Sequence, residues 1–157
     1  MAKKAIVFEP EYVEALRRLF EQTIAFNQVL GLKIDAIRPG SVEGSLAMKP
    51  ELIGHPSHQR LHGGVISASL DAMAGLAIIA AIGARHMDEP AAQRMHRFAR
   101  LGTIDLRIDY LRPALGDRFL LRAEVLRLGS RVATIRMEFA DSAGKLLATG
   151  SAAYIVS

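Results

Sequence analysis

The sequence contains no cysteine. This absence excludes disulfide frameworks, thiolate metal sites and a cysteine nucleophile, and it favours a reducing compartment, so we expect a cytoplasmic protein. The five histidines lack the spacing of a metal site, and the sequence has neither a G-x-S-x-G nucleophile elbow nor a phosphate-binding P-loop. We therefore expect a protein that holds no metal and needs no separate cofactor.

Aromatic residues are also few, with three Tyr, six Phe and no Trp. Little is thus available for stacking on bases, and because zinc spacings and a helix-turn-helix pattern are missing too, we expect no nucleic-acid binding. The formal net charge is +4, and arginines recur through the second half of the chain. This basic excess suits a phosphate-bearing partner about as well as it suits a solvated basic surface.

Long hydrophobic runs are rare. The first apolar run covers four residues and ends at Glu9 and Pro10, which makes it too short for a signal peptide. Residues 65–84 are long enough to cross a membrane and carry a single charge, Asp71. Because small residues fill this segment and the rest of the chain alternates like soluble strands, we expect a helix buried on nearly all sides and no membrane partner.

Periodicity predicts the remaining elements. Helical spacing predicts an amphipathic helix over residues 11–30, opened by Pro10 and closed by Gly31. Alternation with a period of two predicts strands over residues 31–38, 41–48, 103–112, 118–128, 131–140 and 145–156. Residues 50–61 are typical of a loop, and residues 85–101 of a surface excursion with one or two helical turns.

The order of these elements indicates the fold class. Strands joined mostly by hairpins form an antiparallel sheet, and a helix that is apolar on every side must be enclosed by it. We therefore predict an α+β fold in which a curved antiparallel sheet wraps around a long central helix, with a further helix at the N-terminus. Half of the residues are hydrophobic, and the length suits a single domain over residues 1–157.

The central helix begins at His62-Gly63-Gly64. Two glycines destabilise a helix, but they let a ligand approach backbone N–H groups that have no intrahelical partner and carry the positive end of the helix dipole. Such a turn can hold an oxyanion. A tight corner, in which a side chain would collide with the sheet, explains the glycines equally well.

Asp71 is a carboxylate among otherwise uncharged residues. Two explanations fit this position: Asp71 takes part in catalysis, or it is an acid paired with another group inside a subunit interface. It follows Gly63 by eight positions, which separates the two by about 12 Å along one helix. If both act on one substrate, two helices must lie side by side in opposite directions. This geometry predicts a twofold homodimer with two composite sites.

Two segments of the sequence resemble a known protein family. Residues 62–75, with the acid nine positions after the histidine, are similar to the HGG helix of phenylacetyl-CoA-type (PaaI-like) hotdog thioesterases, and residues 102–113 are similar to the strand that follows it. The resemblance covers about residues 25–156. It is strongest to bacterial medium- and long-chain acyl-CoA thioesterases, which carry an extra segment where residues 85–101 stand.

The resemblance implies a function and roles. The Gly63 N–H, with Gly64 as a second donor, would polarise a thioester carbonyl, and Asp71 of the opposite subunit would attack it or activate water. Thr103 stands where relatives have a hydroxyl residue that positions the water, and His62 is mainly a shaping residue. The implied reaction is hydrolysis of medium- to long-chain acyl-CoA in a homodimer that pairs into a tetramer.

One departure concerns the loop before the glycines, where several relatives have an Asn that orients the water or the carbonyl. This sequence offers His55, His58 or Gln59 instead. We take His55 as the catalytic substitute and Gln59 as a substrate-binding residue, although a surface histidine would give the same pattern.

Coenzyme A carries phosphates, which favour arginine at the entrance of the site. We take Arg112 and Arg131 as substrate-binding candidates, with the arginines at 94, 97 and 100 as further ones. Each would also be ordinary as a solvated surface arginine.

Two other functions remain open. A hotdog hydratase acting on acyl thioesters would need an acid/base pair, often as D-x-N-x-x-H, and this spacing is missing. A non-catalytic acyl-CoA-binding or sensing module would keep Gly63 and the groove but would have no need for Asp71.

Overall fold

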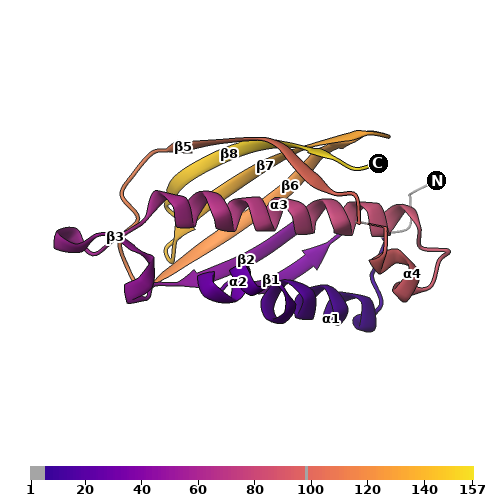
Figure 1. Cartoon of the computed structure of the whole chain (residues 1–157), viewed down its shortest axis with the longest axis horizontal. Coiled ribbons are helices and arrows are strands. Elements are labelled where there is room, and N and C mark those ends of the chain that lie inside the picture. The colour runs from indigo at the N-terminus through magenta and orange to yellow at the C-terminus, as the bar shows by residue number, and fades with distance from the viewer. Residues whose placement is uncertain (1–5, 98) are drawn as a thin grey trace.

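One long helix lies against the concave side of a curved sheet in the computed structural model, which describes residues 6–97 and 99–157 (Figure 1). The helices are α1 (Pro10–Arg18), η1 (Leu19–Thr23, a π-helical turn), α2 (Ala25–Leu30), η2 (Pro50–Leu52), η3 (Pro56–His58), α3 (Gly63–Arg85) and α4 (Ala91–Met95). The strands are β1 (Lys33–Arg38), β2 (Ser41–Ala47), β3 (Ile53–His55), β4 (Arg60–Leu61), β5 (Gly102–Tyr110), β6 (Arg118–Leu128), β7 (Val132–Asp141) and β8 (Leu146–Ile155). The predicted hotdog arrangement, an α+β fold with a sheet wrapped around a central helix, is confirmed.

The main sheet has the strand order β1-β2-β6-β7-β8-β5, and every neighbouring pair is antiparallel. Strands β1 and β5 are its two edges, and β3 and β4 form a separate small hairpin. In β7 every second residue from Ala133 to Phe139 is buried, because alternate side chains of a strand point to opposite faces. These buried residues form the floor against which α3 packs.

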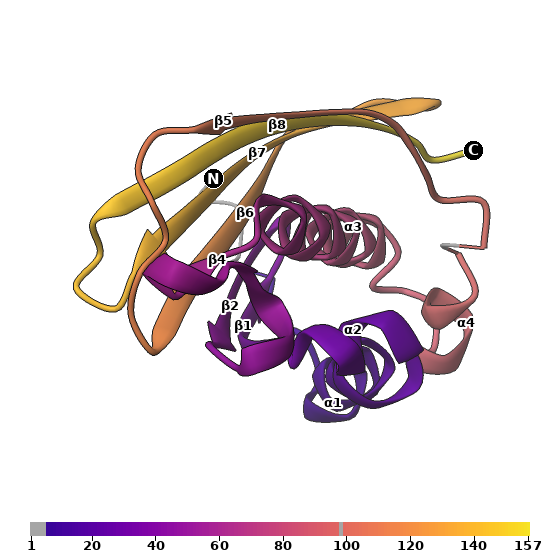
Figure 2. The same cartoon turned by 60° about the vertical axis from the view of Figure 1, so that its left-hand side comes forward.

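Helix α3 lies between the sheet and the N-terminal helices α1 and α2 (Figure 2). It is long and apolar enough to cross a membrane, but 67% of its most apolar stretch is buried inside the fold. Its second half is enclosed, with Leu76 and Ile78 fully buried. Its first half is covered less, since Val65, Ala68 and Ala72 remain partly exposed.

The predicted N-terminal helix is interrupted. A π-helical turn follows α1, and Ile24 then takes an extended conformation (φ −75°, ψ 106°) before α2 begins. Leu16 of α1 and Leu30 of α2, on either side of this break, are both buried in the core. Glu21 in the π-helical turn accepts a 2.7 Å hydrogen bond from the Ile34 N–H and ties this segment to β1.

The predicted loop over residues 50–61 contains secondary structure that the sequence did not indicate. Two 3-10 turns and the hairpin β3–β4 occupy it, and the Leu61 N–H donates to the Ala114 carbonyl at 3.0 Å. The strands contain only three and two residues, so they are too short to give a visible alternation. The hairpin lies beside the start of α3.

The segment over residues 85–101 contains the expected helical turn, α4, after Pro90. It is not wholly a surface excursion, because the Arg94 side chain is completely buried. Arg94 donates to Glu9 at 2.6 Å, and its guanidinium carbon lies 4.3 Å from the centre of the Tyr12 ring. The segment is thus fastened to α1 by a buried cation.

Candidate active site

The start of α3 leaves one backbone amide available. His62 is the N-cap residue, and its Nδ1 accepts a 2.8 Å hydrogen bond from the Gly64 N–H. The next two amides, of Val65 and Ile66, donate to the His62 carbonyl. The Gly63 N–H has no acceptor within residues 6–97 and 99–157. A ligand oxygen at this helix end would therefore meet the Gly63 amide, while Gly64 is already engaged in the cap.

The cap also fixes the chemistry of His62. A backbone N–H can only donate, so Nδ1 must be the acceptor and carries no proton in this arrangement. A lone pair engaged in this way is not available to take a proton from water. In the structure His62 caps the start of α3 through Nδ1.

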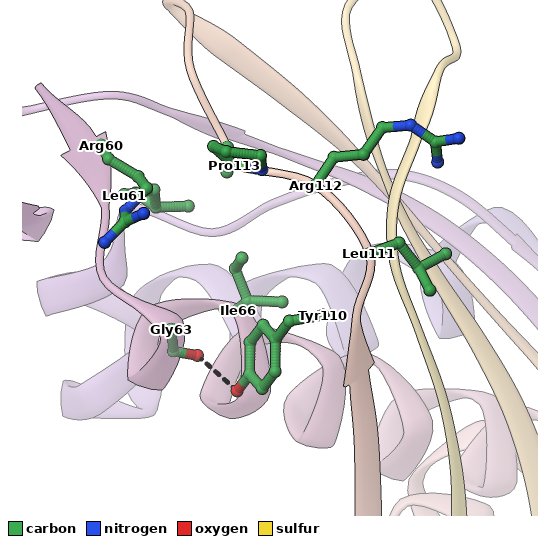
Figure 3. A pocket seen from close by; sticks show the side chains of 9 residues that line it. Arg60, Leu61, Gly63, Ile66, Tyr110, Leu111, Arg112 and Pro113 are labelled. Atoms are coloured by element: carbon green, nitrogen blue, oxygen red, sulfur yellow. Dashed lines mark hydrogen bonds between the residues drawn. The ribbon is translucent and has the colours of Figure 1, made fainter. Parts of the chain in front are cut away.

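Both glycines have close neighbours. A Cβ added at Gly63 would lie 3.3 Å from the Tyr110 ring, and one added at Gly64 would lie 2.9 Å from His62 Nδ1. The Tyr110 hydroxyl donates a 2.9 Å hydrogen bond to the Gly63 carbonyl, so the ring is held over the helix start (Figure 3). The close contacts explain why glycine is needed in this turn, and the same turn presents the Gly63 N–H that could bind an oxyanion. The two explanations for the glycines are therefore compatible.

A pocket of about 360 Å³ opens beside Gly63 (Figure 3). It lies between the β3–β4 hairpin, the first turn of α3 and the segment that follows β5; its lining residues are Arg60, Leu61, Gly63, Ile66, Tyr110, Leu111, Arg112, Pro113 and Ala114. Of the two arginines, Arg60 was not among the predicted residues. Arg112 extends away from Gly63 in Figure 3 and donates to the Leu146 carbonyl at 2.9 Å.

Asp71 lies on α3 and is partly buried. Its Oδ1 atom accepts a 3.0 Å hydrogen bond from the Thr103 hydroxyl of β5. The Tyr154 hydroxyl of β8 also contacts Oδ1, and it lies 3.0 Å from the backbone carbonyl of Asp71. The carboxylate therefore has two hydroxyl groups of the protein as hydrogen-bond partners, so its burial is not an unpaired charge in an apolar core.

Tyr154 was not predicted from the sequence. Its side chain is buried, and this burial, followed by the hydrogen bond to Asp71, raises the pKa of its hydroxyl well above the ordinary value. The hydroxyl therefore stays protonated and remains a donor to the carboxylate.

A β-bulge in β5 turns Thr103 towards α3. The alternation in the sequence groups Ile104 with Leu106 and Ile108 and puts Thr103 on the opposite face. In the β5–β8 ladder, however, Thr103 pairs with Tyr154 and Asp105 with Ala153, so Ile104 is an extra residue that resets the alternation. Ile104 is consequently 57% exposed, and Thr103 faces the helix together with Leu106.

The β3–β4 hairpin carries the three loop candidates. The rings of His55 and His58 lie 4.6 Å apart, and His55 Nδ1 is buried with no hydrogen-bond partner in the described part of the chain. Gln59 donates to the Pro56 carbonyl at 2.9 Å, which uses its amide inside the turn. The hairpin touches the cap of α3, because a Cβ at Gly54 would lie 2.6 Å from the His62 Cα.

The remaining arginines are spread over the molecule. Arg131 is exposed just before β7, near the sheet end where Ala133 pairs with Tyr154. Arg97 donates to Glu89 at 2.6 Å, and this bond lowers the pKa of the Glu89 carboxyl. The interpretation of Arg94 as a phosphate ligand is wrong, since its guanidinium is buried against Tyr12 and paired with Glu9.

The chain matches the model of the thioesterase superfamily over residues 58–148. Among characterised sequences, a medium/long-chain acyl-CoA thioesterase of Escherichia coli (strain K12), YigI, is 32% identical over 152 residues, which cover 97% of this chain and 98% of that protein. The matched region includes the helix start, Asp71 and Thr103.

Solved structures agree with this match. A protein of Shewanella oneidensis related to the thioesterase superfamily is 38% identical, with a TM-score of 0.86 over 96% of this chain and 100% of its own. A structure from Syntrophus aciditrophicus is 37% identical, with a TM-score of 0.82 over 92% and 95% of the two chains.

Proposed function

Because the chain belongs to the thioesterase superfamily, we propose that it is an enzyme that hydrolyses acyl-CoA thioesters to a free acid and coenzyme A. The preferred acyl chains are of medium to long length, as the name of the E. coli relative states for that protein. The reaction needs no metal and no further cofactor, so dialysis against a chelator should leave turnover unchanged.

The observation that carries the proposal is the pair of unlike groups on α3. At the helix start, the Gly63 N–H is without an acceptor in the described residues and lies at the positive end of the helix dipole. Eight residues further along, Asp71 offers a carboxylate held by hydroxyls. Together they supply what thioester hydrolysis requires, an amide for the developing oxyanion and an oxygen that attacks or activates water.

These two groups act on one substrate only if two subunits contribute. Along one helix they are about 12 Å apart, which is too far for a single carbonyl. Two features support a homodimer: the first half of α3 has a partly exposed face of small residues, and β5 is an edge strand with Ile104 and Tyr110 exposed. A twofold axis would bring Gly63 of each subunit to Asp71 of its partner.

The proposed mechanism is short. The carbonyl oxygen of the thioester accepts a hydrogen bond from Gly63, which stabilises the negative charge that develops in the tetrahedral intermediate. Asp71 of the other subunit either removes a proton from the attacking water or attacks the carbonyl carbon itself. The intermediate collapses by expelling the thiolate of coenzyme A, which gives the free acid directly when water attacked. When Asp71 attacked, expulsion of the thiolate leaves an anhydride with Asp71, and a water molecule then hydrolyses this anhydride to the free acid and the regenerated carboxylate. A thiolate leaves readily, so the site needs no strong general acid.

The test is release of free thiol from octanoyl- and palmitoyl-CoA. Because the chain has no cysteine, a thiol-reactive dye reports only the coenzyme A that is released. Asp71→Asn should reduce turnover by at least about a hundredfold, the lower range for a group that transfers a proton. The matched control is Asp117→Asn, an exposed acid that should leave turnover unchanged.

Other results would favour another function. Saturable binding of acyl-CoA by the unaltered chain without thiol release would indicate a sensing module. Addition of water to an enoyl-CoA without thiol release would indicate a hydratase. A panel of acyl-CoA substrates from acetyl to palmitoyl separates these outcomes and gives the chain-length preference in the same experiment.

A further inference from the structure

The Tyr154 hydroxyl is the least expected feature around Asp71. Tyr154 lies on β8 with 3% of its surface exposed, so its ring is fixed by the core. Its hydroxyl lies 3.0 Å from the Asp71 carbonyl and also contacts Oδ1 of the carboxylate. In the ladder Tyr154 stands directly opposite Thr103, whose hydroxyl donates to the same Oδ1 atom.

We propose that Tyr154 is a positioning residue that, together with Thr103, fixes Oδ1 of Asp71 and thereby presents Oδ2 to the reacting water or carbonyl. This inference rests on the proposed function. It assigns different tasks to the two oxygens of one carboxylate: one is held by the fold, and the other does the chemistry.

The hydrogen bonds support this division. Both hydroxyl contacts with the carboxylate end on Oδ1, and within residues 6–97 and 99–157 no donor is bonded to Oδ2. A carboxylate oxygen with two donors has lost most of its capacity to accept further hydrogen bonds, so a water molecule is better accepted by Oδ2. The groups that contact the carboxylate from β5 and β8 are both neutral hydroxyls, and no cation in the described part of the chain forms an ion pair with Asp71.

Tyr154 is held more rigidly than Thr103, and this rigidity is what it adds to the positioning of the Asp71 carboxylate. Thr103 is an exposed residue on an edge strand, so fewer neighbours hold its side chain in place. Tyr154 is buried and also reaches the backbone carbonyl of residue 71, so it links the carboxylate to the helix that carries it. Catalytic groups must be held close to their productive geometry, because small displacements reduce the rate strongly.

The test begins with Tyr154→Phe, which removes one oxygen atom and keeps the ring. We expect kcat to fall about tenfold with KM changed by less than about twofold, because the lost hydrogen bond acts on the chemical step. The matched control is Tyr12→Phe. Tyr12 is fully buried in the first turn of α1, its hydroxyl has no hydrogen-bond partner in the described residues, and the loss of this hydroxyl should leave kcat unchanged.

A double-mutant cycle tests the shared oxygen. If Tyr154 and Thr103 hold the same atom, the effects of Tyr154→Phe and Thr103→Val on kcat will not be additive. Wild-type kcat in Tyr154→Phe, with Asp71→Asn inactive, would overturn this inference and leave the proposed function intact. Full activity of Asp71→Asn would instead contradict the proposed function.

Discussion

The Thr103 hydroxyl donates a 3.0 Å hydrogen bond to Oδ1 of Asp71, across a separation of 32 residues in the chain. The bond exists because the bulge at Ile104 turns Thr103 inward. A single extra residue in an edge strand thus brings a hydroxyl to the central helix, in keeping with the frequent occurrence of bulges beside active sites.

Thr103→Val should therefore reduce kcat by about tenfold, because valine keeps the shape of the side chain but cannot donate to the carboxylate. Thr103→Ser should retain most of the activity. The matched control is Thr134→Val, on the exposed face of β7, which should behave as the unaltered protein. Equal activity of Thr103→Val and the control would show that this hydroxyl has no part in turnover.

Gly63→Pro should reduce kcat by at least about a hundredfold, the loss typical of an oxyanion-hole donor. Proline fits the first position of a helix, and His62, with φ −65° and ψ 135°, already has the conformation that precedes a proline. The substitution thus removes an N–H that has no intrahelical partner, and the midpoint of thermal unfolding should change little.

Gly63→Ala is the control for this variant. It adds a Cβ at 3.3 Å from the Tyr110 ring, as proline does, but keeps the N–H. Its kcat should lie well above that of Gly63→Pro. If the two variants were equally slow, crowding of Tyr110 and not loss of the amide would be the cause.

Arg94→Met should lower the midpoint of thermal unfolding by about 5 °C and leave KM for acyl-CoA unchanged. The variant loses the ion pair with Glu9 and the contact with the Tyr12 ring. Arg18→Met, at an exposed position on α1, is the matched control. A raised KM in Arg94→Met with unaltered stability would restore the phosphate role that the buried position argues against.

The same pair predicts a pH dependence of stability. The hydrogen bond from Arg94 lowers the pKa of the Glu9 carboxyl below its ordinary value of 4.5. A lowered pKa in the folded state stabilises the protein above pH 4.5, and this contribution is lost as the pH falls below that value. The difference in stability between the unaltered protein and Arg94→Met should therefore narrow in acid, as measured by urea unfolding at pH 7 and pH 3. A constant difference would contradict this account of the pair.

Much of the fold could be predicted because it depends on local periodicity. The strands over β1, β2, β6, β7 and β8, and the buried helix α3, follow from alternation and from the long apolar run. The bulge at Ile104 could not be predicted, since the alternation continues through it without a break. Register depends on the partner strand β8, which a local pattern does not contain.

The residues of the candidate site were likewise predictable only where a local pattern in the sequence marks them. The Gly63 amide and Asp71 stand out in the sequence because glycine and an acid are unusual at a buried helix. Tyr154 does not stand out, because a tyrosine in an alternating strand is typical of a core residue, and its partner is 83 residues away. Arg94 was misjudged for a similar reason: its segment is basic, and burial is decided by Glu9 in a distant part of the chain.

The central claim is that each site combines Gly63 of one subunit with Asp71 of the other, and complementation tests it most directly. Gly63→Pro and Asp71→Asn proteins are each inactive, and they are unfolded together and refolded so that subunits mix at random. Half of the dimers then combine the two variants, and each has one intact site and one doubly altered site, so we predict recovery of about a quarter of the unaltered activity. No recovery, although mixed dimers are detected by mass, would mean that both groups act within one chain and would contradict the account.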